Sequence, residues 1–226
     1  MKYLYSLLIC LSFTAYIHGQ SKSLSAFDRI KTGGSVTVNL VQSDHYKAEY
    51  VITKGYEEDL IVEVNNRTLT VKINGKSSWW KNRDTKATVT VYSKEILSVD
   101  CSAGSALRSD DVWKAPDMKI NVSSGASCSL GIEVGNLVAE ASSGGKISLE
   151  GKSGSSELEA SSGGSISAFP LTSLSADVDV SSGGSVKLYA SESLKASASS
   201  GGSIRYKGNP EIKRLNAGMS GSIKTY

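Results

Sequence analysis

A short serine- and glycine-rich motif recurs along the C-terminal half of this chain. ASSGGKISL begins at Ala141 and returns, with small changes, from Ala160, Val180 and Ala198. The apolar residue that closes each copy recurs after 21, 19, 19, 20, 18 and 19 residues, at Leu107, Cys128, Ile147, Ile166, Val186, Ile204 and Ile223. A period near 19 residues leaves no room for a helix beside the strands, so each repeat is predicted to form one coil of a β-solenoid.

Alternation within each repeat predicts which side chains face the core, because successive strand residues point to opposite sides. The closing apolar column is expected to point inward, as are two columns before the turn. These run through Val99, Ile120, Ala139, Leu158, Val178, Ala196 and Leu215, and through Cys101, Val122, Ala141, Ala160, Val180, Ala198 and Ala217. The paired glycines are expected to supply positive φ at a sharp corner. The stacked serines are interpreted as structural, with hydrogen bonds from coil to coil.

A less regular portion precedes the array. Residues 24–100 contain TGGSVTVNL, which resembles the later repeat and predicts a first coil. LIVEV and TLTVKI lie on either side of Asn65-Asn66 and predict a hairpin, and ATVTVY predicts another strand. We therefore expect one all-β domain over residues 20–226, a parallel β-helix of right-handed winding, with irregular coils and a hairpin in 24–100 and the repeat array in 101–226.

The first nineteen residues are typical of a secretory signal peptide. Lys2 is followed by an apolar run that is short for a membrane span, and Gly19 offers a cleavage point. An uncleaved anchor is the alternative. No later apolar run could cross a bilayer, so we expect export to the periplasm, the cell surface or the medium. Without Lys2, 24 basic residues face 22 acidic ones, a balance that argues against a nucleic-acid partner.

Two cysteines remain after the leader, and a disulfide must be considered in an exported protein. Cys101 lies before its turn and Cys128 lies after the next one, so the two are not expected to stack directly. We expect two small buried thiols, with a disulfide as the alternative.

A polar segment between two predicted strands holds the candidate binding residues. Trp79 and Trp80 are adjacent and are followed by Lys81 and Arg83. Exposed tryptophans beside basic side chains could stack on a sugar or on a partner's surface, so a glycan or an envelope component is the candidate partner. The alternative is that these tryptophans cover an end or a side of the solenoid.

The outward columns offer two further hypotheses. Glu140, Glu159 and Asp179 fall on consecutive coils, where oxygen ligands about 5 Å apart could hold a divalent cation. As exposed charges they repel by only about 0.8 kcal/mol per pair in water and need no metal. The column after the turn becomes basic toward its end, which suits an anionic ligand or simply keeps an exposed strand soluble. It runs through Arg108, Ser129, Ser148, Ser167, Lys187, Arg205 and Lys224.

The remaining patterns favour a binding module over an enzyme. His45 is the only histidine outside the leader, which makes triad or histidine–metal chemistry a poor fit, and no cofactor is expected. One alternative is a polysaccharide-active enzyme that uses the carboxylates of Glu140, Glu159 and Asp179. Another is a self-assembling envelope scaffold, because the ends of a solenoid expose unpaired strand edges.

The order of the motifs resembles a known family. Phe27 to Gly34 reads F-D-x-I-x-x-x-G, followed by S-V-T-V, then N-R-T-L-T-V, then the S-S-G-G array. Together these cover nearly the whole mature chain and are similar to the auto-transporter adhesin head GIN domain family of bacterial exported proteins. The resemblance implies an exported β-helical domain of undetermined molecular function, with adhesion suggested by the family name. It implies no functional residues.

Overall fold

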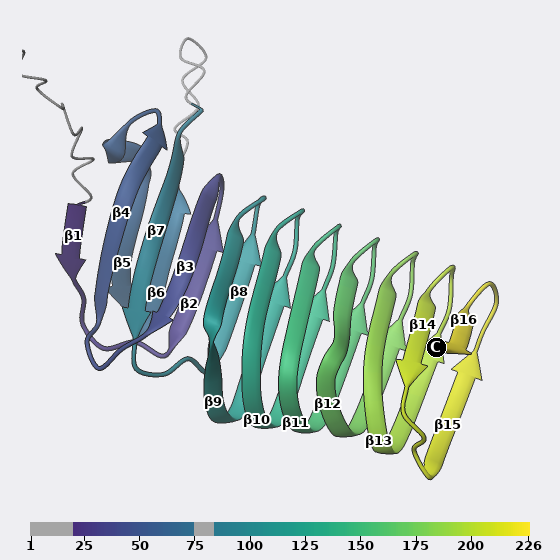
Figure 1. Cartoon of the computed structure of the whole chain (residues 1–226). Helices are drawn as coiled ribbons and strands as arrows, with labels where there is room; N and C mark the ends of the chain where they lie inside the picture. The colour runs from purple at the N-terminus through teal and green to yellow at the C-terminus, as the bar shows by residue number, and fades with distance from the viewer. Residues whose placement is uncertain (1–19, 75–83) are drawn as a thin grey trace, which may run out of the picture.

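The chain forms a row of stacked β-coils with a broader N-terminal end (Figure 1). The computed structural model describes residues 20–74 and 84–226, so the predicted leader lies outside the described residues. Within these ranges the secondary structure is sixteen strands and one 3-10 helix, η1 (Glu57–Asp59). No helix in this part of the chain is long and apolar enough to cross a membrane. The all-β solenoid prediction is confirmed.

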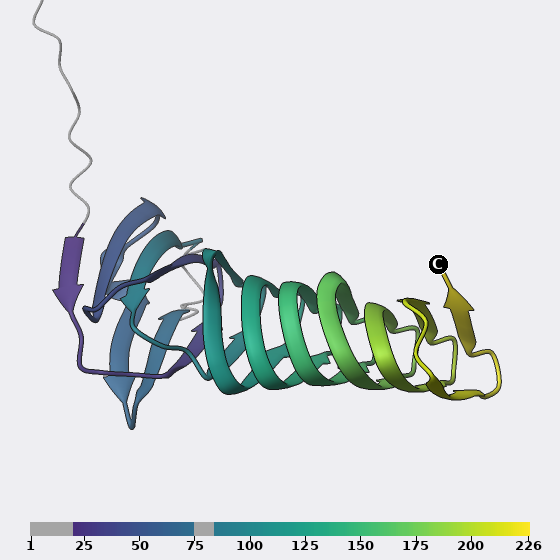
Figure 2. The ribbon, with the colours of Figure 1, turned by 60° about the horizontal axis from the view of Figure 1, so that its bottom comes forward.

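Five long curved strands build the array, and each runs along one face of the solenoid, round a bend and back along the other face (Figures 1 and 2). They are β9 (Ala106–Val122), β10 (Ser127–Ala141), β11 (Lys146–Ala160), β12 (Ser165–Val180) and β13 (Ser185–Ala198). Consecutive strands pair in parallel. The coils that follow are divided into β14 (Ser203–Lys207), β15 (Ile212–Ala217) and β16 (Ser222–Thr225). Each repeat of about 19 residues thus forms one coil.

The register of the coils confirms the predicted columns. The closing apolar residues from Leu107 to Ile223 are paired in one unbroken series, and the first six are at most 2% exposed. The columns before the turn are buried in the same way up to β13. Their last members, Leu215 and Ala217, are exposed, so the prediction that they are core residues is wrong. Within the described residues, no further coil stacks on them.

The serine–glycine corner is a type I′ turn. In the turn that begins at Ser142, the left-handed residues are Ser143, with φ 48°, and Gly144, with φ 75°. The N–H of Gly145 closes the turn by donating to the carbonyl of Ser142 at 2.8 Å. Gly145 itself is not left-handed, but a Cβ built on it would lie 2.2 Å from the carbonyl oxygen of Val122 in the preceding coil. The expectation that both glycines supply positive φ is therefore wrong, because the second one supplies space.

The turns are also hydrogen-bonded to one another. The N–H of Gly144 donates to the carbonyl of Ser162 in the next turn at 3.2 Å, and the equivalent bond recurs from Gly104 to Gly183. Side chains add to this where the hydroxyls of Ser185 and Ser165 are 3.1 Å apart, and where those of Thr32 and Ser105 are 2.8 Å apart. From Gly104 to Gly183, each corner is thus hydrogen-bonded to the corner of the next coil.

The N-terminal portion continues both faces of the array as two layers. The first layer runs β1 (Gln20–Ser23), β4 (Lys47–Lys54), β7 (Lys86–Ser93), β3 (Val36–Gln42), then β9. The second runs β5 (Leu60–Asn65), β6 (Thr68–Ile73), β2 (Arg29–Gly33), β8 (Ser98–Ser102), then β9. β2 and β3 are the predicted first coil. β5 and β6 are the predicted hairpin, with positive φ at Asn66 and Arg67.

The core is one continuous hydrophobic cluster that runs the length of both layers. Cys101 and Cys128 are buried in it as free thiols, which confirms the predicted state of the two cysteines. The two thiols form a hydrogen bond with each other, and this bond together with burial raises the pKa of Cys128 well above its ordinary value. Because neither side chain is more than 2% exposed, both thiols act as small core residues.

Candidate binding groove

Two of the coils are longer than the others, and their extra residues form β-bulges on one face. The pairing of β9 with β10 jumps from Arg108 and Ser129 to Val112 and Gly131, so three residues of β9 oppose one of β10. In β12 the residues 168–170 oppose only two residues of β11. Between these bulged strands, β10 and β11 pair residue for residue from Ser127 to Val134. Two regular coils thus lie between two bulged ones.

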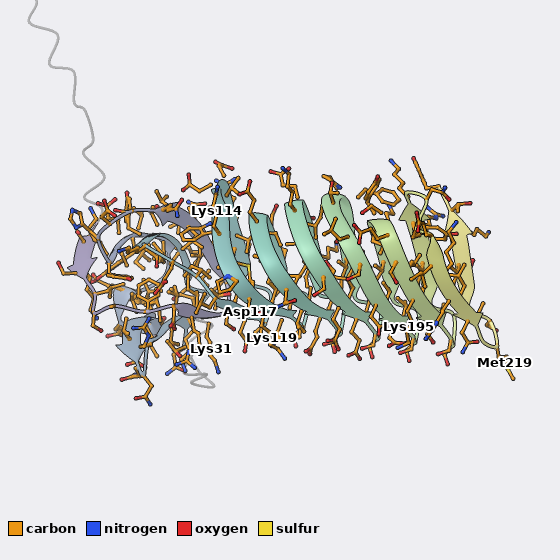
Figure 3. All side chains as sticks on the ribbon, turned by 90° about the horizontal axis from the view of Figure 1, so that it is seen from below. Lys31, Lys114, Asp117, Lys119, Lys195 and Met219 are labelled. Atoms are coloured by element: carbon orange, nitrogen blue, oxygen red, sulfur yellow. The ribbon has the colours of Figure 1, made fainter. Side chains whose placement is uncertain are left out.

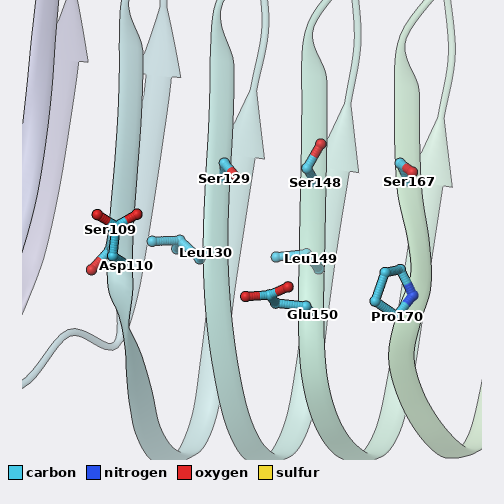
Figure 4. Close-up of a pocket in the computed structure, with 9 residues that line it drawn as sticks. All are labelled: Ser109, Asp110, Ser129, Leu130, Ser148, Leu149, Glu150, Ser167 and Pro170. Carbon is cyan, nitrogen blue, oxygen red and sulfur yellow. The ribbon is translucent and has the colours of Figure 1, made fainter.

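A depression of about 300 Å³ lies on the regular coils between the bulges. Ser129, Ser148 and Ser167 form a line across three consecutive coils in this depression, and their register is direct (Figure 4). The same outward column carries Arg108 before these serines and Lys187 after them, so the short hydroxyl side chains leave a hollow between two long cationic ones. We call this feature the serine groove.

Two carboxylates and a proline complete the serine groove. Asp110 comes from the bulge of β9, Pro170 from the bulge of β12, and Glu150 from β11 (Figure 4). Their side chains are exposed, as befits groups available to a ligand. Each serine hydroxyl can donate and accept hydrogen bonds, whereas an ionised carboxylate only accepts them. This combination suits a ligand that carries many hydroxyl groups.

Beyond the serine groove, the same face carries aromatic side chains and a lysine. Phe169 lies next to Pro170 in the bulge of β12, and its ring centroid is 5.0 Å from that of Tyr226. The ammonium of Lys207 lies 4.6 Å from the centroid of Phe169 and 4.5 Å from that of Tyr226. Bulges are frequent where a strand must redirect a side chain. Here one bulge both borders the groove and places an aromatic ring where the C-terminal residues pack on it.

The predicted carboxylate column exists, on the strand segments before the turn. Glu140, Glu159 and Asp179 are paired on consecutive coils. Glu140 accepts a hydrogen bond from the ammonium of Lys119 at 2.8 Å, which raises the pKa of that lysine. Figure 3 labels Lys119 together with Lys195, which makes a similar pair with an aspartate of its neighbouring coil. Across the described residues, no group of three or more His, Cys, Asp or Glu side chains is arranged to hold a metal ion.

The predicted binding residues Trp79, Trp80, Lys81 and Arg83 lie outside the described residues. The structure does describe the strands on either side of them: β6 pairs in parallel with β2, and β7 pairs in parallel with β3. Contact of these four residues with a ligand stays a prediction.

The serine groove was not identified from the sequence, although a signal for it was present. The repeat steps of 21 and 20 residues stand on either side of two steps of 19. Extra residues in a coil whose neighbours keep their register must be absorbed as bulges. Longer repeats on both sides of two regular ones thus indicate a bordered surface.

Stacked parallel coils with a polar groove on one face define the class of this protein as a β-solenoid. The family described as "Putative auto-transporter adhesin, head GIN domain" matches residues 26–210. The chain belongs to this family, which confirms the resemblance found in its motifs. The family description supports a binding or adhesion role.

Solved structures agree on the fold. A putative adhesin from Bacteroides fragilis superposes with a TM-score of 0.82 at 20% identity, covering 92% of this chain and 96% of its own. A putative adhesin from Parabacteroides distasonis gives 0.73 at 21% identity, with the same coverage. A protein from Parabacteroides distasonis described as a putative lipid binding protein gives 0.66 at 24% identity, again covering 92% and 96%. Comparison with curated proteins gave no match.

Proposed function

We propose that this protein is an exported, non-enzymatic adhesion module of the bacterial cell envelope that binds a hydroxyl-rich ligand, such as a glycan, in the serine groove. The observation that carries the proposal is the line of Ser129, Ser148 and Ser167 in a hollow bordered by two bulges and two carboxylates. The groove lies on fully paired strands, so its donors and acceptors are held in place before the ligand arrives. Such preorganisation lowers the entropic cost of binding.

Adhesion fits the groove better than catalysis does. A serine hydroxyl becomes a nucleophile only beside a base that takes its proton. The serine groove is lined by hydroxyls, exposed carboxylates, leucines and a proline, with no histidine or lysine among its lining residues. In the described part of the chain His45 is the only histidine, and it lies in the connection between β3 and β4. The groove can hold a ligand, and no histidine lines it to take the proton of a serine hydroxyl.

Export to the cell envelope is supported by the signal-peptide pattern of residues 1–19 and by the family to which the chain belongs. The serine groove would then face polymers outside the cytoplasm. A repeat array suits this task, because stacked coils extend a recognition surface along a polymeric ligand.

Binding should be tested with purified residues 20–226 on an array of glycans and envelope polymers, with and without calcium. The decisive variant is Ser148→Lys, because lysine already occupies the same outward column at position 187 and should not disturb the fold. We expect it to lower affinity at least about tenfold, or about 1.4 kcal/mol, with an unchanged melting temperature.

Ser197→Lys is the matched control, because Ser197 lies on an outward column that is not part of the serine groove. This variant should bind as the parent protein does. A ligand that binds Ser148→Lys as tightly as the parent would show that the serine groove is not the site, and an array without any hit would refute glycan binding itself.

A further inference from the structure

The two layers of the solenoid end in single-paired strands at both ends of the molecule. The first layer runs from β1 to β16 and the second from β5 to β15, and in the described part of the chain each of these strands pairs on one side only. β1 and β5 lie at the opposite end from β15 and β16 (Figure 1). The outer backbone N–H and C=O groups of these four strands face away from the protein, and edges of this kind pair readily with another chain.

The C-terminal end also leaves apolar side chains uncovered. Leu215 continues the column of Ala196, yet Leu215 is 45% exposed whereas Ala196 is 1% exposed. Ile212 is 58% exposed, and Met219 is 90% exposed and projects from the end of the molecule (Figure 3). Leu215 occupies a position that the next coil covers everywhere else in the array, so this end exposes a strand face that is buried between coils elsewhere. Ile212 and Met219 add apolar area at a strand position and a turn position that are not buried in the other coils.

The two ends carry opposite charge. Residues 203–226, which form the C-terminal end, contain five basic residues and one acidic residue, a formal charge of +4. Residues 20–23 and 56–65, which form β1, η1 and β5 at the other end, contain four acidic residues and one basic residue, a formal charge of −3. One of the four carboxylates, that of Asp59, is buried, and the other three are exposed. Tyr56 and the half-buried Leu60 provide apolar area beside these carboxylates. The ends are thus complementary in charge and both carry apolar surface.

We propose that copies of this protein associate end to end, with β15 and β16 of one copy pairing with β5 and β1 of the next. β1 is antiparallel to β4, which is antiparallel to β7, so β1 runs in the direction of the coils and would meet β16 in parallel. β5 is antiparallel to β6 and would meet β15 in antiparallel fashion. Both backbone patterns are ordinary. Because the two surfaces differ, repetition of the contact would produce chains rather than closed dimers.

Self-association can be measured by light scattering and sedimentation velocity on residues 20–226, from low to high micromolar concentration. The average mass should rise from that of a monomer to at least twice that value, and it should fall when salt screens the charged ends. Two double variants reverse the charge of one end each: Lys213→Glu with Arg214→Glu, and Glu58→Lys with Glu63→Lys. Each should remain monomeric at all concentrations.

Mixing the two double variants is the decisive step, because each then offers the end that the other has lost. The mixture should regain the association that neither variant shows alone. Lys146→Glu with Lys152→Glu is the control for the variant with Lys213→Glu and Arg214→Glu. It makes the same charge change on exposed residues in the middle of the array. A parent protein that stays monomeric throughout, or charge-reversed ends that leave its association unchanged, would overturn the proposal.

Discussion

Gly163 and Gly164 are neighbours in one turn, yet an added methyl group meets different surroundings at each. Gly163 has φ 74°, and a Cβ built on it has no atom within 4 Å. A Cβ on Gly164 would lie 2.1 Å from the carbonyl oxygen of Ala141 and 2.5 Å from its carbonyl carbon. Gly163→Ala therefore tests backbone conformation alone, whereas Gly164→Ala tests how closely the coils stack.

The two costs differ in origin and size. Gly163→Ala must hold an L-residue in the left-handed region, which costs roughly 1–2 kcal/mol. Gly164→Ala must move backbone away from backbone in a region where Ser161 donates to the carbonyl of Ala141 at 3.0 Å. Overpacking costs about 1–3 kcal/mol and a disturbed hydrogen bond about 1 kcal/mol more, so we expect roughly 3 kcal/mol. At this chain length that loss lowers the melting temperature by roughly 6–12 °C.

Thermal and urea unfolding followed by circular dichroism measure both variants. The first two turns carry Ser105 and Ala126 at the position of Gly164, which shows that a small shift of the backbone can accommodate a Cβ there. Ala126→Gly is therefore the control and should cost no more than about 1 kcal/mol. If Gly163→Ala proved as destabilising as Gly164→Ala, close stacking of the coils would not be the reason for the second glycine.

Three further predictions concern the core, the thiols and the tryptophans. Ile166→Asp should unfold the array, because it removes roughly 1.5–3 kcal/mol of stabilisation by burial and adds an unpaired buried charge. Ser167→Asp should leave the melting curve nearly unchanged, and equal stability of the two variants would refute the assignment of inward and outward columns. Cys128 should resist alkylation at pH 8 until the protein unfolds. Because its pKa is raised in the folded state, the thiol loses its proton at a lower pH in the unfolded chain than in the folded one. The free energy of unfolding should therefore fall above about pH 8.5, by at most about 1.4 kcal/mol per pH unit. Trp79→Ala with Trp80→Ala should weaken ligand binding without lowering the melting temperature, and a large fall would instead make these residues a cover for the solenoid.

The column structure could be predicted because a solenoid repeats its register at every coil. Once Ile147 and Ile166 are aligned in the sequence, pairing places them side by side, and alternation fixes their neighbours. The same reasoning failed at Leu215, since alternation says which way a side chain points but not whether another coil will cover it. Burial at the end of an array depends on what stacks there.

The conformation of the turn was only partly predictable. Positive φ was assigned to both glycines, but a type I′ turn needs it at the two central residues, of which one is Ser143. The constraint on Gly145 comes from Val122, which is distant in sequence and adjacent only after stacking. A single repeat therefore contains no information on that contact.

The serine groove and the N-terminal layers depend on pairings that local patterns leave open. The number of extra residues in the longer repeats can be counted in the sequence. Where these residues lie within the coil depends on the point at which the neighbouring strands return to register. In the same way the strand content of 24–100 was predictable, whereas the antiparallel pairing of β4 with β7 was not. Alternation is the same for parallel and antiparallel partners.

The hydrogen-bonded turns have a consequence for how such a protein can vary. Loops elsewhere usually tolerate insertions because few bonds hold them. Here every corner from Gly104 to Gly183 is bonded to the next, so an insertion in one turn would break bonds in two coils. Length changes are instead accommodated as bulges in the strand segments after the turn, as in β9 and β12. New recognition surfaces, whether evolved or engineered, would therefore be introduced on that face rather than at the corners.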